Sequence, residues 1–193
     1  MKLLLSIVLP LLFICQATCQ GNKLDYYYEI PTAPTEYTAG SVAARVVDGL
    51  GFRYYWGTEG LRQEDLGFKP SDEARTIEET MDHIVSLTQI LVDAVNEKPF
   101  GGVDLEGKSY EDKRNMTLRN IREAGEKLKK SSSEDLERYD MIFSSSNEFP
   151  FWNLLNGPIA DAINHVGQII SIRRTSGNPY NQNISVLRGK VKN

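Results

Sequence analysis

Apolar residues recur at helical spacing in four stretches of the chain, and each stretch predicts one helix. Proline, glycine and polar runs separate these stretches, as at Pro99 and between Gly177 and Pro179. The rest of the sequence has little strand pattern, so we expect an all-α fold in the form of a four-helix bundle. The predicted helices cover residues 41–61, 76–98, 110–130 and 150–176.

Two of the predicted helices carry a clear apolar stripe, which we expect to face the core. The stripe of the first helix consists of Val42, Val46, Leu50, Tyr54 and Leu61. The stripe of the second helix consists of Ile77, Met81, Ile84, Leu87, Leu91 and Val95. The segment between the third and fourth helices leaves two alternatives open, a short helix capped at Ser133 or an extended stretch at "RYDMIF".

The first 19 residues have the order of a secretory signal peptide. Lys2 precedes an uncharged run from Leu3 to Ile14, and small or polar residues follow up to Cys19. About 12 apolar residues are too few to span a bilayer, so no membrane span is predicted. Cleavage after Cys19, or alternatively after Gly21, would give an exported protein, periplasmic or secreted. A lipoprotein anchored through Cys19 is the less favoured alternative.

The remaining chain divides into three parts. Residues 20–38 form an extended N-terminal tail, because Pro31 and Pro34 exclude a long helix. Residues 39–180 form the helical bundle, and residues 181–193 form a C-terminal tail. Both cysteines lie in the signal peptide, so the mature chain would have no disulfide and would need an ordinary apolar core.

The formal net charge of the whole chain is -4 at neutral pH. Nucleic-acid binding requires a basic face, so this mild acidity argues against a nucleic-acid partner.

Two histidines and one aspartate lie at the edges of the apolar stripes. At 100° per residue, His165 falls about 40° from Asp161 on the fourth helix, and Leu87 falls about 40° from His83 on the second. Packing of the two stripes would bring His83 against Asp161 and His165. Two imidazoles and a carboxylate suit a divalent metal, and three protein ligands leave the open positions typical of a catalytic site.

A structural alternative explains the same residues without a metal. A histidine at the edge of a core usually forms a hydrogen bond to a neighbour, and Asp161 could simply pair with His165. Two further polar residues lie close to the three candidates. Gln168, about -20° from Asp161, is placed to support a ligand or line a pocket. Glu79, one turn before His83, is more simply an exposed helix residue than an additional ligand.

The stretches "NGPIADAINHVGQIISIRRTSGNP" and "RYYWGTEGLRQEDLGFKPSDEARTIEETMDHI", with the four-helix plan, resemble the DinB-like family of metal-binding bundles. The likeness extends from about Thr38 to Pro179. It implies that His83 and His165 bind a divalent metal. Asp161 departs from the family pattern, because many members carry a histidine there. A carboxylate makes softer metals less favoured and harder metals more favoured. The identity of the metal therefore stays open among Zn, Ni, Fe and Mn.

The resemblance implies a metal-dependent protein, and it leaves the reaction open between a hydrolase and a thiol transferase. It also implies a homodimer. The alternative is a non-catalytic bundle that binds a metal or a small-molecule ligand or serves for dimerisation, or one that has lost its metal with Asp161 as the trace of that loss.

Overall fold

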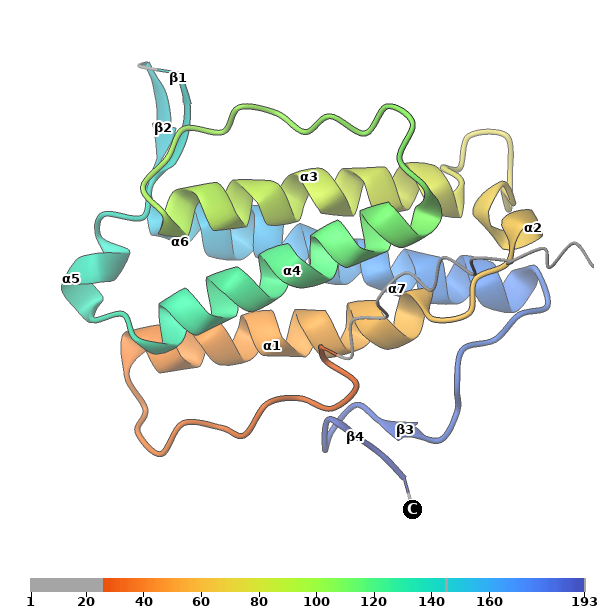
Figure 1. Ribbon diagram of the computed structural model, residues 1–193, viewed down its shortest axis with the longest axis horizontal. Coiled ribbons are helices and arrows are strands. Elements are labelled where there is room, and N and C mark those ends of the chain that lie inside the picture. Colours follow the sequence, from red (N-terminus) through yellow and green to blue (C-terminus); the bar gives the residue numbers. More distant parts are fainter. Residues whose placement is uncertain (1–25, 145, 193) are drawn as a thin grey trace, which may run out of the picture.

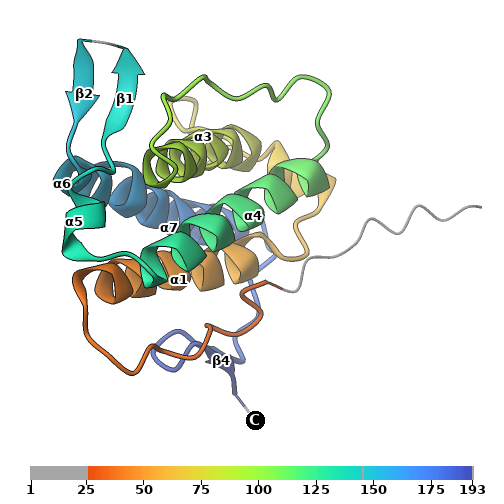
Figure 2. The same cartoon turned by 60° about the vertical axis from the view of Figure 1, so that its left-hand side comes forward.

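The computed structural model describes residues 26–144 and 146–192, and this part of the chain is mostly helical. Its long helices are α1 (Ala39–Thr58), α3 (Ile77–Val95), α4 (Tyr110–Lys129) and α7 (Ala160–Thr175). Helices α1 and α3 each pack against both α4 and α7 (Figures 1 and 2). The all-α prediction is therefore confirmed. The predicted signal peptide, residues 1–19, lies outside the described residues.

Short elements join the long helices. The helices α2 (Gln63–Leu66) and α5 (Ser133–Leu136) are single turns, and β1 (Met141–Ser144) pairs antiparallel with β2 (Asn147–Phe149). The segment after α4 thus contains both a short helix and an extended stretch, but the helix is capped by Ser132 rather than Ser133, and the strand begins only at Met141. A second antiparallel pair, β3 (Ile184–Ser185) with β4 (Lys190–Val191), lies near the C-terminal end.

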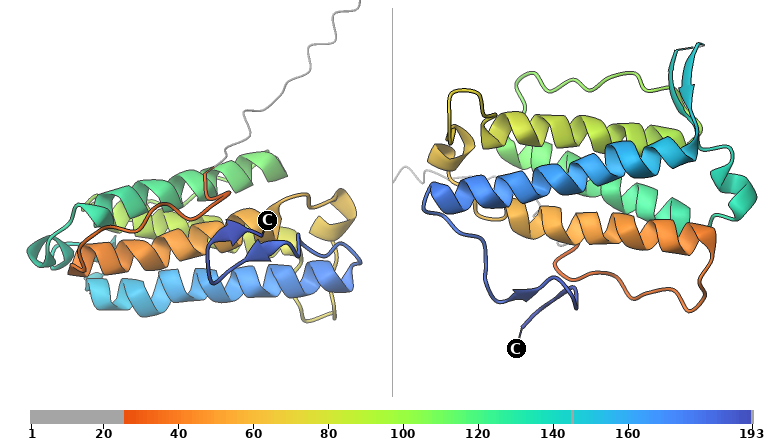
Figure 3. Two further views of the ribbon diagram at one scale, coloured as in Figure 1. Left: turned by 90° about the horizontal axis from the view of Figure 1, so that it is seen from below. Right: turned by 180° about the vertical axis from the view of Figure 1, so that it is seen from behind.

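The connection from α3 to α4 is long and returns along the helices, so that α3 and α4 begin at the same end (Figures 1 and 3). This arrangement makes α3 and α4 parallel neighbours, whereas α7 runs opposite to α3. Among the helices described, none is long and apolar enough to cross a membrane.

The apolar stripe predicted for α3 is confirmed, since all six of its residues are buried. The stripe predicted for α1 is partly wrong. Val42 and Val46 are 51% and 42% exposed, and Ala43 and Val47 occupy the core instead. Successive steps of four residues rotate by about 40° each around a helix, so a stripe drawn only at such steps leaves the buried face.

The predicted fourth helix is interrupted near its start. After α6 (Phe151–Leu154), a wide π-type turn, η1 (Leu155–Ile159), precedes α7. Gly157 departs from helical backbone angles, with φ -94° and ψ -106°, and Pro158 has no amide proton with which to continue the hydrogen bonds of α6. The chain therefore bends immediately before Asp161.

The described part of the N-terminal tail lies along α1. Tyr27 is buried, and its hydroxyl donates a hydrogen bond of 3.2 Å to the carboxylate of Asp48. A Cβ on Gly51 would come within 2.5 Å of the Tyr27 ring, so a glycine at position 51 permits this contact. Residues 26–38 thus pack on α1 through Tyr27.

Arg173 ties the end of α7 to the end of α1. Its buried guanidinium donates hydrogen bonds to the carbonyl oxygens of Gly57 and Glu59, at 2.9 and 3.0 Å, and to that of Asn178 at 2.7 Å. These carbonyls lie at helix ends, where no intrahelical donor is available. Arg173 therefore has a structural role, because it joins the ends of α7 and α1.

We expect Arg173→Met to lower the free energy of unfolding by about 2–3 kcal/mol, because several buried carbonyls would lose a charged donor. Urea denaturation followed by circular dichroism measures this change. Arg174→Met is the matched control, since Arg174 is exposed and only overlies the Tyr180 ring at 5.1 Å. Equal destabilisation by the two variants would contradict the prediction.

Candidate metal centre

His83 lies midway along α3, whose start is fixed by a capping box. The side chain of Thr76 accepts a hydrogen bond from the amide of Glu79, and Glu79 Oε2 accepts one of 2.8 Å from the Thr76 amide. Glu79 is therefore used as a helix cap, which confirms that it is better interpreted as an exposed helix residue than as an additional ligand. The side chain of His83 is partly exposed, beside the buried face of α3.

Asp161 and His165 lie one turn apart on α7, immediately after the π-type turn. The Asp161 side chain is 42% exposed, whereas that of His165 is only 10% exposed. The first turn of a helix is electrostatically favourable for a carboxylate, so Asp161 is stabilised at this position. The bend before α7 and the packing of α7 on α3 together set the direction in which both side chains point.

The three predicted residues meet between α3 and α7. Asp161 Oδ2 lies 3.3 Å from His83 Nε2, and Asp161 Oδ1 lies 3.4 Å from His165 Nε2. The two imidazole rings are 4.7 Å apart between centroids and nearly perpendicular. One ligand atom from each residue falls within 4.8 Å of the others, so the group is compact enough to hold a single metal ion.

Gln168 fixes the orientation of the His165 ring. His165 Nδ1 lies 2.8 Å from Gln168 Oε1, a carbonyl oxygen that can only accept a hydrogen bond. This contact favours the tautomer in which Nδ1 donates to Gln168, and Nε2 then faces Asp161 without a proton. A histidine that binds a metal through one nitrogen commonly donates from the other in this way.

The hydrogen bond to Gln168 determines how the other nitrogen of His165 interacts with the Asp161 carboxylate. A neutral His165 presents the lone pair of Nε2 to the Asp161 carboxylate, which also presents lone pairs. Two acceptors at 3.4 Å repel each other. A cation on this side of the ring, either a proton on Nε2 or a metal ion, removes the repulsion.

The neighbouring acid, Asp82, is engaged elsewhere. Its carboxylate forms an ion pair of 2.8 Å with Lys113, which also binds Glu78 at 2.9 Å. Burial lowers the pKa of Lys113, but the hydrogen bonds and charges of Asp82 and Glu78 outweigh burial, and the net shift is upward. The ammonium is thus held charged by two acids, and Asp82 is not a fourth member of the candidate site.

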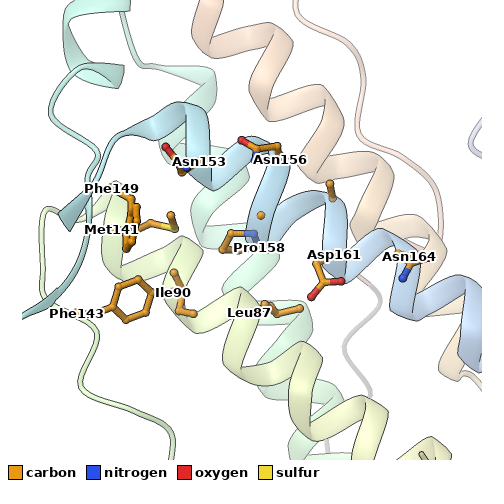
Figure 4. A pocket seen from close by; sticks show the side chains of 12 residues that line it. Leu87, Ile90, Met141, Phe143, Phe149, Asn153, Asn156, Pro158, Asp161 and Asn164 are labelled. Carbon is orange, nitrogen blue, oxygen red and sulfur yellow. The ribbon is translucent and has the colours of Figure 1, made fainter. Parts of the chain in front are cut away.

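Two hollows in the surface adjoin the three residues. One, of about 650 Å³, extends from Asp161 toward β1 and β2 (Figure 4). The other, of about 500 Å³, is lined by His165, Gln168, Thr80 and residues of the α2–α3 connection. The candidate site is therefore accessible to small molecules from two directions.

No protein-family model matches this chain, and no curated protein matches it.

The sequence predicted all three residues of the group and the neighbourhood of Gln168, and the structure brings these four residues together. The sequence did not predict the larger hollow, to which Phe143 and Phe149 contribute from the β1–β2 hairpin. The apolar residues at the end of "RYDMIF" indicated a buried or ligand-contacting segment. The pattern of apolar positions did not show which helices this segment would contact.

We expect His165 to carry its proton on Nδ1 in the metal-free protein at mildly alkaline pH, because Gln168 accepts from that nitrogen. In Gln168→Met the Nε2-protonated form should become the major one, since the Asp161 carboxylate is then the remaining acceptor. Long-range proton–nitrogen NMR distinguishes the two tautomers, and the chain has only two histidines to assign. Gln168→Glu, which keeps an acceptor, is the control. A wild-type protein with the proton on Nε2 would contradict the assignment.

Proposed function

We propose that the protein binds one divalent metal ion through His83, Asp161 and His165, between α3 and α7. The observation that carries the proposal is the orientation of His165, whose Nδ1 lies 2.8 Å from Gln168 Oε1 while its Nε2 faces the Asp161 carboxylate at 3.4 Å. A metal ion ligated by both groups satisfies two acceptors that otherwise repel. His83 Nε2 completes a set of three ligand atoms from two helices.

The donor set limits the choice of metal. Two imidazole nitrogens and one carboxylate oxygen suit Zn, Ni, Fe or Mn, and the absence of a thiolate among these ligands disfavours softer ions. Sites of this composition occur with zinc in hydrolases and with iron in oxygenases. Elemental analysis of the purified protein distinguishes among these four metals.

We favour a catalytic role because the site is open. Three protein ligands leave coordination positions free, and hollows reach the group from two sides. A metal there would supply Lewis acidity to a bound small molecule. Hydrolysis and thiol transfer both use this chemistry, and the role of Gln168 in either is to hold the ring of His165 in position.

The wider classification is also a proposal. The packing of α1 and α3 against α4 and α7 is compatible with a DinB-like four-helix bundle, as are the site residues themselves. We also propose that residues 1–19 direct export of the protein and that the protein forms a homodimer.

We expect the purified, untagged mature protein to contain close to one equivalent of a transition metal by inductively coupled plasma mass spectrometry. The His83→Ala/His165→Ala double variant should contain none, and Asp161→Ala should bind the metal more than about 100-fold more weakly, because a direct ligand matters at least as much as its supporting contacts. Competition with a chromogenic chelator measures the affinities.

Asn164→Ala is the control, because Asn164 is an exposed neighbour of His165 on α7. It should leave metal content unchanged, and thermal melting should show that all variants are folded. No metal in the wild type after reconstitution with excess Zn, Ni, Fe and Mn would overturn the proposal. An unchanged affinity in Asp161→Ala, with loss in His83→Ala, would remove Asp161 from the ligand set.

A further inference from the structure

We propose that the larger hollow beside Asp161 binds an uncharged, aromatic or branched apolar group of the molecule that coordinates the metal. This inference rests on the proposed metal site and names the class of ligand that the site would accept.

The hollow has an apolar floor and wall. They are formed by residues of α3, of the β1–β2 hairpin and of the turn before α7, namely Leu87, Ile90, Met141, Phe143, Phe149 and Pro158. The two phenylalanine rings are about 38–39% exposed and stack edge-on with centroids 6.1 Å apart. Aromatic rings held at a partly exposed surface offer a preformed contact for another ring.

The hollow is continuous with the candidate metal site. Asp161 is one of its lining residues, and Leu87 lies one helical turn beyond His83 on α3. In Figure 4 the side chains extend from Phe143 and Phe149 at one end to Asp161 and Asn164 at the other. A molecule bound to the metal on this side would therefore direct its remaining atoms toward the hairpin.

The charges around the hollow select against an ionic group. Among the described residues that line it, Asp161 is the only charged one, and the other polar side chains are the neutral amides of Asn153, Asn156 and Asn164. An anionic group would find no basic partner there and would lose hydration without compensation. The smaller hollow differs, because Arg75 lines it.

Hydroxamic acids test this proposal, because their hydroxamate chelates a metal while the attached group can vary. Acetohydroxamic, benzohydroxamic and 4-carboxybenzohydroxamic acids would be titrated into Zn²⁺-loaded and Ni²⁺-loaded protein by calorimetry. We expect benzohydroxamic acid to bind at least about tenfold more tightly than acetohydroxamic acid, since its ring is buried in the hollow. The carboxylated ring should lose most of this advantage.

The variant Phe143→Ser/Phe149→Ser removes the aromatic end of the hollow. It should reduce the advantage of the phenyl probe by about fivefold or more and leave the affinity for acetohydroxamic acid unchanged. Both positions are partly exposed, so the substitutions are compatible with folding. Trp152→Ser is the matched control, since Trp152 is an exposed aromatic residue that lines a different hollow.

The outcomes separate the two proposals. Equal affinities for the acetyl and phenyl probes, tightest binding of the carboxylated probe, or an unchanged preference in the double variant would overturn the apolar subsite while the metal site stands. Failure of every probe to bind a wild type that takes up no metal would overturn the metal site, and this inference with it.

Discussion

The packing of α3 on α7 determines where every residue of the candidate site lies. Both helices bury an apolar face, and burial of each large apolar side chain is worth about 1.5–3 kcal/mol, far more than any single polar contact between them. His83, Asp161 and His165 occupy the edge of those faces, so the packing that buries Leu87 and Ile169 also brings the polar atoms together. The geometry of the site is thus a consequence of the core, and the core supplies the free energy that holds three polar side chains in one place.

Helix α7 is fixed at both ends, which gives the site a defined register. At its start, Pro158 and the preceding glycine interrupt the helical hydrogen bonds and set the rotation at which Asp161 enters the interface. At its end, Arg173 joins α7 to the last carbonyls of α1. A slip of one residue in α7 would turn His165 by about 100° and separate it from His83, so these two constraints matter for the site although neither touches it.

The elements that the sequence predicted well are those set by local periodicity. The α3 stripe is regular over 19 residues, and its faces follow directly from helical geometry. The histidines were predictable partners because each lies at a stripe edge. The features that the sequence did not predict depend on contacts between distant segments. The kink at Gly157 is one such feature, because the following Pro158 is also compatible with the first turn of an uninterrupted helix. The hollow is another, because it depends on where the β1–β2 hairpin meets α3. The error at Val42 has a different cause, since four-residue steps drift away from the buried face of α1.

The polar contacts among these three residues add little to the stability of the fold. Asp161 and His83 are partly exposed, and exposed charged pairs contribute about 1 kcal/mol or less. His83 Nε2 lies within hydrogen-bond distance of Asp161, at 3.3 Å, and Gln168 holds the far nitrogen of the His165 ring, so that Nε2 of this ring also faces the carboxylate. Two imidazole nitrogens and a carboxylate are thereby directed toward one point, which is the donor set of a three-ligand metal site. A cation bound there, either a proton on Nε2 or the proposed metal ion, would stabilise the convergence more than the partly exposed pairs alone.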